Sequence, residues 1–370
     1  MNIRHELIMA TSKFIPSMAF HPGVTLAEKL KEIDMSIKEF ALRASKPEKT
    51  IHAVIKGESS VTSDMAVAFE SVTRIPAHFW LNKQRNYDEY QARARKEATI
   101  AEACEWAKCF PYSQMVKLGW IEPVKTPQEK AKVLLSFFQM SSVKAWEDYY
   151  INQKLKIAFR ISLAHTKDPH SVSAWLRQGE LQAAEMKTPD YSEVKLKDLI
   201  PLLKSVMIYQ PSDFASKVRE LCAEVGIKLV YTPCLQKAPV GGSTRWINGT
   251  PCIQISGRHK RYDIFWFTLF HEIGHILLHG KKDIFLEDDC HTEDEQKKEN
   301  EANQFSSHVL LSRADEDEII RNGVFTPDAI KEYADRFNTH PSVIVGRLQH
   351  HKVIPYTKNS DMLLPIDLFR

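Results

Sequence analysis

Two histidines and a glutamate stand at a metal-binding spacing in the C-terminal half of the chain. His271 and His275 are four residues apart, and Glu272 directly follows the first histidine. Four residues make about one turn of an α-helix, so both imidazoles leave the same helix face and can reach one Zn²⁺. Glu272 can turn toward a metal-bound water and take its proton. The spacing therefore predicts two zinc ligands and a general base for hydrolysis.

The residues around this motif predict a buried helix. Residues 262–278 are almost continuously apolar, and a helix that is apolar on nearly every side lies in a domain core. A chance match to the motif is the alternative, but chance matches fall mostly on polar surface helices. Two histidines and a glutamate are costly to bury without partners, and one metal ion is a partner for all three.

The third zinc ligand is expected from the next helix, predicted over residues 293–311. On the helical wheel Glu299 lies nearer the apolar face than Glu301, so Glu299 is the predicted ligand and Glu301 the alternative. Asn303, one turn beyond Glu299, could bind the second nitrogen of a ligand histidine. A solvated acidic surface is the other interpretation of this cluster. Two histidines and a carboxylate would leave the fourth zinc position open to water.

Two further histidines fit the site less well. His279 lies eight residues past His271, roughly 12 Å along a helix axis, so one ion cannot bind both. We expect His279 to interact with the end of the helix, where a positive charge is favourable. His340, directly before Pro341, could donate a hydrogen bond to the oxyanion formed in amide hydrolysis. An ordinary helix-start residue is the simpler interpretation of His340.

Residues 261–312 resemble the ImmA/IrrE family of intracellular zinc metallopeptidases. The shared marks are the HExxH block at 267–275, the Glu-x-Glu-Ala-Asn-x-Phe helix from Glu299, and Val309-Leu310-Leu311. The resemblance implies a gluzincin-like site, with Glu272 as base and His271, His275 and Glu299 on zinc. It also implies hydrolysis of peptide bonds in a protein partner, because members of this family typically cleave a repressor protein.

The N-terminal part of the chain predicts a bundle of short helices. The first carries an apolar stripe near Leu26, and Ser36 with Glu39 forms a capping box for the second. Pro47 suits the first position of a third helix, and Thr62 begins a fourth. Short helices joined by a tight turn at this spacing indicate a helix-turn-helix. A plain helical protein-binding module is the alternative.

The third of these helices would be the recognition helix of a DNA-binding domain. Polar residues near the start of such a helix reach base edges, while lysine and arginine meet phosphates. Such motifs commonly act as a dimer on a palindromic site. The predicted DNA contacts are Arg43, Lys46, Glu48, Lys49, Thr50, His52 and Lys56.

Residues 20–92 look like the Xre-type DNA-binding domain of HigA antitoxins. The resemblance implies operator DNA as a partner, a homodimer, and a cognate toxin as a further partner. Ser45 replaces the usual turn glycine and Pro47 the usual serine cap, so Ser45 must adopt a strained left-handed conformation if the turn is kept. The marks of the resemblance are His21-Pro22-Gly23, the segment from Ile51 to Gly57, Phe79-Trp80-Leu81-Asn82 and Tyr87-Asp88.

The composition is that of a globular protein with two or three domains. The chain has 370 residues, and its formal net charge of +3 (50 basic against 47 acidic side chains) argues neither for nor against nucleic acid. We find no apolar run of about 18 residues and no signal peptide, so we expect no membrane contact. We expect a cytoplasmic location, and the six cysteines, which form no CxxC pair and no tight framework, are then expected to be reduced thiols.

The predicted fold class is α+β and mainly helical, with a lambda-repressor-like domain first and a gluzincin-like domain with a small antiparallel sheet last. A hairpin is expected to turn at Asn248-Gly249. Pro201 predicts a helix boundary. The aromatic residues of the helical middle region are expected in its core. The predicted segments are an N-terminal arm over 1–20, the helix-turn-helix domain over 21–95, the helical middle over 96–220 and the metallopeptidase-like domain over 221–370.

Together these features predict a DNA-binding transcription regulator and antitoxin that carries a zinc-dependent metallo-endopeptidase. The alternative is a HigA-like antitoxin and operator-binding repressor whose peptidase-like domain is a non-catalytic sensor or scaffold. Zinc content and cleavage of a protein partner distinguish the two.

Overall fold

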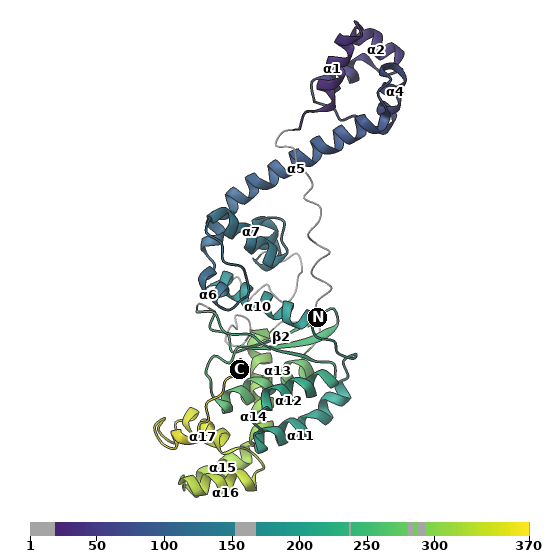
Figure 1. Cartoon of the computed structure of the whole chain (residues 1–370). Helices are drawn as coiled ribbons and strands as arrows, with labels where there is room; N and C mark the ends of the chain where they lie inside the picture. Colours follow the sequence, from purple (N-terminus) through teal and green to yellow (C-terminus); the bar gives the residue numbers. More distant parts are fainter. Residues whose placement is uncertain (1–18, 152–167, 237, 280–284, 287–292, 370) are drawn as a thin grey trace, which may run out of the picture. The chain divides into compact units, whose positions relative to one another are not determined.

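The computed structural model describes residues 19–151, 168–236, 238–279, 285–286 and 293–369. Contacts divide the chain into two compact units, Met1–Ala101 and Glu102–Arg370, and Figure 1 labels many of their helices and strand β2. The predicted N-terminal arm over 1–20 lies outside the described residues except for its last two positions. The domain boundaries predicted near residues 95 and 220 stay predictions.

Unit 1 is a helical bundle around a single apolar core. Phe69 contacts both Phe40 and Trp80 edge to face, with ring centroids 5.2 and 5.6 Å apart. Gly23 allows a close approach, because a Cβ at this position would lie 1.9 Å from the Val54 carbonyl oxygen. The helices are α1 (Pro22–Glu32), α2 (Ile37–Arg43), α3 (Glu48–Ile55), α4 (Ser63–Thr73) and the first part of α5 (Ala77–Lys108).

The turn between α2 and α3 carries backbone strain. Ser45 has a φ of +49°, in the left-handed region, which confirms the expectation that the turn is kept without its usual glycine. The Ser36 hydroxyl accepts the N–H of Glu39, but the Glu39 carboxylate binds Arg43, so only half of the predicted capping box is seen. Pro47 is the N-cap of α3 rather than its first helical residue.

The first part of unit 2 is helical and packs around aromatic side chains. Trp106, Phe110, Phe138 and Trp146 form one cluster with centroid distances between 4.7 and 6.3 Å, as expected for core residues. Trp120 is only half-buried. The elements are α6 (Tyr112–Lys117), α7 (Pro127–Phe138), α8 (Val143–Trp146), the π-helix η1 (Glu147–Ile151) and α10 (Pro169–Ala184).

A four-stranded sheet of order β1-β3-β2-β4 follows. The predicted hairpin is confirmed, since β2 and β3 pair antiparallel around Asn248 and Gly249, which both have positive φ. β1 pairs parallel with β3, so the sheet is mixed and not wholly antiparallel as predicted. Strand β3 lies between β1 and β2, although it follows both of them in the chain. The strands are β1 (Lys228–Tyr231), β2 (Gly242–Ile247), β3 (Thr250–Ile255) and β4 (Phe285–Leu286).

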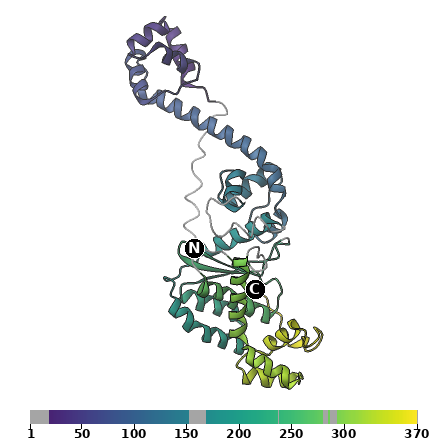
Figure 2. The same cartoon turned by 180° about the vertical axis from the view of Figure 1, so that it is seen from behind.

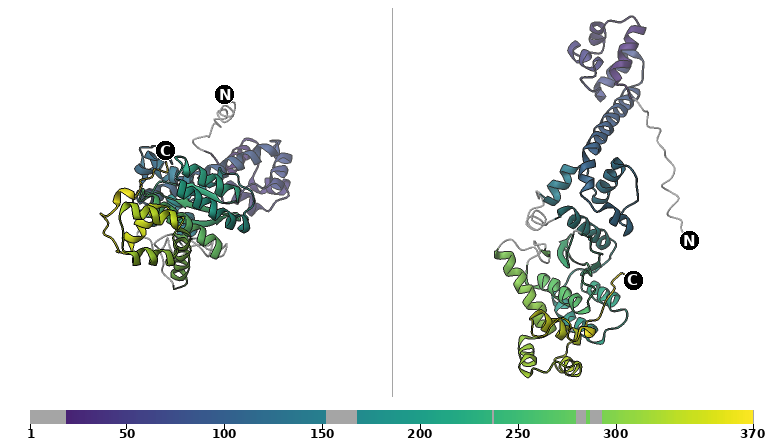
Figure 3. Two further views of the ribbon diagram at one scale, coloured as in Figure 1. Left: turned by 90° about the horizontal axis from the view of Figure 1, so that it is seen from below. Right: turned by 90° about the vertical axis from the view of Figure 1, so that its left-hand side faces the viewer.

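Helix α13 (Tyr262–Leu278) packs on β2 and β3 and lies at the centre of the main core of unit 2. Its Trp266, Phe270 and Ile273 side chains are fully buried, as the apolar run predicts. Figure 2 shows the sheet and its helices from behind, and in Figure 3 the last helices gather at one end of the unit. The other helices are α11 (Glu193–Tyr209), α12 (Phe214–Glu224), α14 (Glu293–Leu310), α15 (Arg313–Asn322), α16 (Pro327–Arg336), α17 (Pro341–His350) and η2 (Ser360–Met362).

Helix α11 continues through Pro201, so the helix boundary predicted there is wrong. Leu199 and Leu203 on either side are buried in the core. Their burial outweighs the one backbone hydrogen bond that proline cannot donate. Within the described segments, none of the helices has both the length and the apolar character to cross a bilayer.

Candidate metal centre

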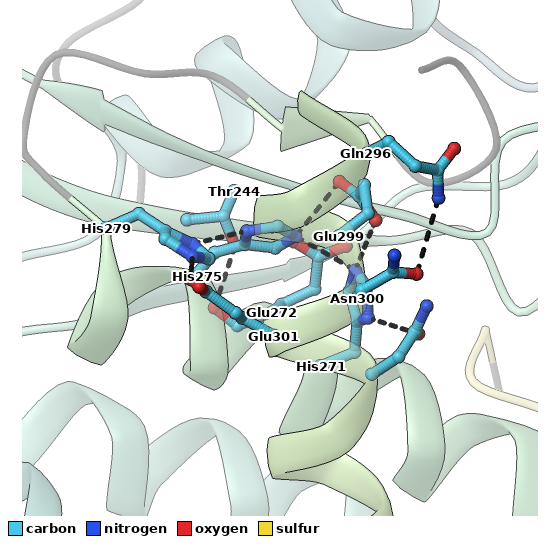
Figure 4. Close-up of polar contacts among 10 residues, drawn as sticks. Thr244, His271, Glu272, His275, His279, Gln296, Glu299, Asn300 and Glu301 are labelled. Carbon is cyan, nitrogen blue, oxygen red and sulfur yellow. Dashed lines mark hydrogen bonds and ion pairs between the residues drawn. The ribbon is translucent and has the colours of Figure 1, made fainter. Parts of the chain in front are cut away.

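Two packed helices hold the predicted metal ligands. α13 contributes His271 and His275, and α14 contributes Glu299 (Figure 4). Gly274 lies where these helices meet, and a Cβ there would stand only 3.1 Å from the ring of Phe305. The missing side chain lets the two helices approach closely, which brings the carboxylate of α14 to the histidines of α13.

The ligand-type atoms of these residues converge on one point. The Nε2 atoms of His271 and His275 lie 2.9 Å apart. Glu299 Oε2 lies 3.1 Å from His271 Nε2, and Glu299 Oε1 lies 3.2 Å from His275 Nε2. All three residues offer a ligand atom within 4.8 Å of the others. The residues are 1%, 1% and 7% exposed, so this group could hold one metal ion away from bulk water.

The charge states of these side chains suit a metal site. Burial lowers the pKa of His275 to about 4, so its imidazole is neutral at pH 7. Burial acts to raise the pKa of Glu299, but its close contacts with the rings of His271 and His275 outweigh it and lower that pKa to about 2. Neutral imidazole and ionised carboxylate are the forms that bind a divalent cation.

The donor set fits zinc. His271 Nδ1 lies 2.9 Å from Asn303 Oδ1, which confirms the predicted contact. Because this oxygen only accepts, the ring proton of neutral His271 sits on Nδ1, and Nε2 presents a lone pair. That lone pair points at the same space as His275 Nε2 and the Glu299 carboxylate. Two imidazoles and one carboxylate are a ligand set of hydrolytic zinc sites, with a fourth position left for water.

Glu301 and His279 lie beside the ligand group and not in it. His279 Nδ1 is 3.0 Å from His275 Nδ1, and His279 Nε2 is 3.1 Å from Glu301 Oε2. His279 is the C-cap of α13, and its backbone N–H bonds the carbonyl oxygen of His275. The favourable charge interaction expected at the helix end stays a prediction. Glu301, the alternative ligand, therefore contacts His279, while Glu299 is the carboxylate that faces both ligand rings.

Glu272 is held by strand β2. The Thr244 hydroxyl donates a hydrogen bond of 2.6 Å to Glu272 Oε2, and both residues are buried (Figure 4). Gly242 leaves room for the same carboxylate, because a Cβ there would lie 2.5 Å from Oε1. Neither Thr244 nor Gly242 was predicted as a site residue. Their place opposite Glu272 depends on how the sheet packs against α13, and no local spacing signals it.

A pocket of about 890 Å³ opens beside the ligand group. Its lining includes His271, Glu299 and Phe267, together with Arg347 of α17. Its volume lies in the range of ordinary ligand pockets. A polypeptide segment could therefore reach the ligand group from this pocket.

His340 lies apart from this centre. Its Nδ1 accepts the backbone N–H of Ser342 at 3.1 Å, and it is the N-cap of α17. Its ring packs edge to face against Tyr262 at the start of α13, with centroids 4.9 Å apart. The helix-start interpretation therefore describes His340, and its role as an oxyanion donor has no support in this geometry.

The seven predicted DNA contacts lie on α2, α3 and the residues next to them. Lys46 and Thr50 are half-buried, and the others are exposed. Arg43 pairs with Glu39 at 2.6 Å, but exposed ion pairs of this kind hold side chains weakly. The exposed residues of the set, Arg43, Glu48, Lys49, His52 and Lys56, are accessible to a ligand of unit 1.

Comparison with known proteins gives two separate likenesses. The family model of the IrrE N-terminal-like domain matches residues 222–349. An addiction module antidote protein of the HigA family from Coxiella burnetii is 32% identical, and the match covers 23% of this chain and 95% of that chain, with a TM-score of 0.22. No curated protein matches the chain.

Two solved structures from Pseudomonas aeruginosa are also similar. Antitoxin HigA, solved with the higBA promoter, is 27% identical over 22% of this chain and 91% of its own, with a TM-score of 0.22. PA4674, solved in complex with its operator DNA, is 26% identical over 21% of this chain and 87% of its own, with a TM-score of 0.21.

The likeness to the Coxiella burnetii protein combines 32% identity with 95% coverage of that protein. The IrrE N-terminal-like model accounts for a different part of the chain, which includes the HExxH motif and Glu299. The chain is therefore similar to a HigA-family protein in its N-terminal part, and it carries an IrrE N-terminal-like domain over residues 222–349.

Proposed function

We propose that the chain is a DNA-binding regulator of the antitoxin type whose C-terminal domain is a zinc-dependent metallo-endopeptidase. The observation that carries the hydrolase is the buried convergence of His271, His275 and Glu299, with Glu272 next to the first ligand. The IrrE N-terminal-like match over the same residues supports it. The substrate class is a polypeptide, with a repressor-like protein as the expected partner.

Each of these residues has a separate role in the proposed amide hydrolysis. Zinc held by His271, His275 and Glu299 would supply a Lewis acid and lower the pKa of a water. Glu272 takes the proton of the attacking water and hands it to the leaving amine. The hydrogen bond from Thr244 keeps the Glu272 carboxylate in one place between these two transfers. The neighbouring pocket receives the polypeptide.

The test compares wild type with Glu272→Gln, which removes the base and keeps the shape of the side chain. We expect wild type to retain zinc and to cleave labelled casein or candidate repressor proteins, whereas the variant retains zinc and cleaves neither. A variant as fast as wild type refutes the role of Glu272, and a wild-type chain without zinc refutes the metal site. A zinc-loaded chain that cleaves none of these proteins supports the non-catalytic sensor or scaffold.

We further propose that unit 1 binds operator DNA as a homodimer on a palindromic site. Lys49 and Thr50 stand at the start of α3, where the polar side chains of a recognition helix meet base edges and its lysines meet phosphates. Two relatives solved with operator or promoter DNA agree with this proposal. The HigA likeness also makes a cognate toxin an expected partner.

Lys49→Ala and Thr50→Ala test the recognition helix in the full chain. We expect Lys49→Ala to weaken operator binding and to lower its salt dependence by about one counterion, because a phosphate contact is lost. Thr50→Ala should reduce the preference for the operator over unrelated DNA. The exposed Lys187 of unit 2 provides the control as Lys187→Ala. Unchanged binding by both α3 variants, with unchanged circular dichroism, contradicts the assignment of α3.

A further inference from the structure

His279 and Glu301 form a line of contacts that starts at the ligand residue His275. His275 Nδ1 lies 3.0 Å from His279 Nδ1, and His279 Nε2 lies 3.1 Å from Glu301 Oε2 (Figure 4). The His279 side chain is 3% exposed, and that of Glu301 is 42% exposed. The line therefore runs from the buried ligand group to the protein surface.

We propose that Glu301 and His279 act as a positioning relay for His275, an inference that rests on the zinc site proposed above. Neither residue belongs to the group that would hold the ion. Their role is to fix the orientation and the tautomer of the ligand ring through consecutive hydrogen bonds. His279 is thereby a functional residue, although its distance from His271 excludes it as a ligand.

The directions of these hydrogen bonds follow from one another. A neutral His275 that binds zinc through Nε2 carries its proton on Nδ1 and donates it. The only acceptor that His279 can offer at this point is the lone pair of its Nδ1, so its own proton sits on Nε2. That N–H then donates to Glu301 Oε2, since an ionised carboxylate only accepts. The hydrogen bond from His275 to His279 thus requires the tautomer of His279 that donates to Glu301.

The two ligand rings are held by unlike partners from the same helix. Asn303 accepts from His271 directly, whereas Glu301 acts on His275 through a second imidazole. A carboxylate at the end of the line makes His275 Nε2 a stronger donor than a neutral amide would. Loss of the relay should therefore weaken metal binding, with no change in the three ligands.

Zinc affinity, measured by competition with a chelator, tests the relay without any substrate. His279→Phe keeps a ring of similar size and removes the acceptor, so we expect zinc affinity to fall about 10- to 100-fold. His308→Phe is the matched control, because His308 is an exposed histidine on α14. Equal zinc affinity in His279→Phe and His308→Phe overturns the proposal.

Glu301 offers a second and milder pair of variants at a partly exposed position. Glu301→Ala removes the acceptor of the His279 proton and should weaken zinc binding, whereas Glu301→Gln keeps an oxygen there and should restore most of it. A purely structural role of Glu301 would not separate alanine from glutamine in this way. Equal affinity in both variants and wild type removes Glu301 from the relay.

The N–H···N hydrogen bond can also be observed directly in the zinc-loaded chain labelled with ¹⁵N-histidine. We expect a ¹⁵N–¹⁵N coupling between His275 Nδ1 and His279 Nδ1, and the Nε2–H tautomer for His279. An Nδ1–H tautomer for His279 overturns the proposal even where zinc is bound. A wild-type chain that binds no zinc refutes the proposed metal site instead, so the two failures are distinguishable.

Discussion

Protonation of His340 should destabilise the protein at low pH. The residue is 8% exposed and caps α17, and burial lowers its pKa from 6.5 to about 4, while Asp263 offsets part of that effect. Between pH 6.5 and pH 4 the unfolded chain binds a proton that the folded chain does not. Stability is therefore complete above pH 6.5 and falls as pH decreases, by about 2 kcal/mol at pH 5 and about 3 kcal/mol near pH 4.

His340→Asn isolates this contribution, because asparagine is also a good N-cap and does not titrate. The assay is urea unfolding of the full chain at pH 7.5 and pH 5.0. The loss of packing against Tyr262 lowers the stability of the variant at both pH values and cancels in the difference. We expect wild type to lose about 2 kcal/mol more than the variant on acidification.

The exposed His308 provides the control, since His308→Asn should lose as much stability as wild type does between the two pH values. If His340→Asn loses as much as wild type, the buried neutral histidine is not a source of acid sensitivity. A larger loss of stability in His340→Asn than in wild type would mean that folding raises the pKa of His340 instead of lowering it.

Three further predictions concern the site and unit 1. Gly242→Ala places a Cβ 2.5 Å from Glu272 Oε1, so cleavage should fall about 100-fold with zinc content unchanged; a parallel loss of zinc would show a wider disruption. Ser45→Gly removes the strain of a φ of +49° and should stabilise unit 1 by about 1 kcal/mol, read as a higher urea midpoint. Ser45→Ala should give no such gain, and equal midpoints for the two variants refute the strain. Chelation should lower the melting temperature of unit 2, and added zinc should restore it, because an ion held by His271, His275 and Glu299 stabilises only the folded state. A melting temperature that changes with neither treatment contradicts the metal site.

The part of the site that lies on single helices could be predicted from sequence, because helix geometry follows from local spacing. The pairing of His271 with His275 needs only their separation of four residues. The choice of Glu299 over Glu301 needs only the apolar face of its helix, and the structure turns Glu299 toward the histidines. The contact of Thr244 with Glu272 could not be predicted, because Thr244 lies 28 residues away in the sequence, on a strand whose packing is set by the whole domain.

The fold follows the same division between local and distant information. The hairpin at Asn248-Gly249 has a local turn signal and was predicted. The parallel pairing of β1 with β3 joins strands that are not consecutive in the chain, and the predicted antiparallel direction is wrong for this pair. Pro201 carries a local helix-breaking signal, yet burial of Leu199 and Leu203 outweighs it. Local rules fail where tertiary burial opposes them.

One helix supplies three different parts of the proposed metal centre. Within α14, Glu299 faces both ligand rings, Glu301 reaches His275 through His279, and Asn303 binds His271. A turn of this helix by one residue, about 100°, would displace all three side chains together. The close contact of α14 with Gly274 of α13 opposes such a turn. Changes in this contact should therefore weaken zinc binding even when every ligand is retained.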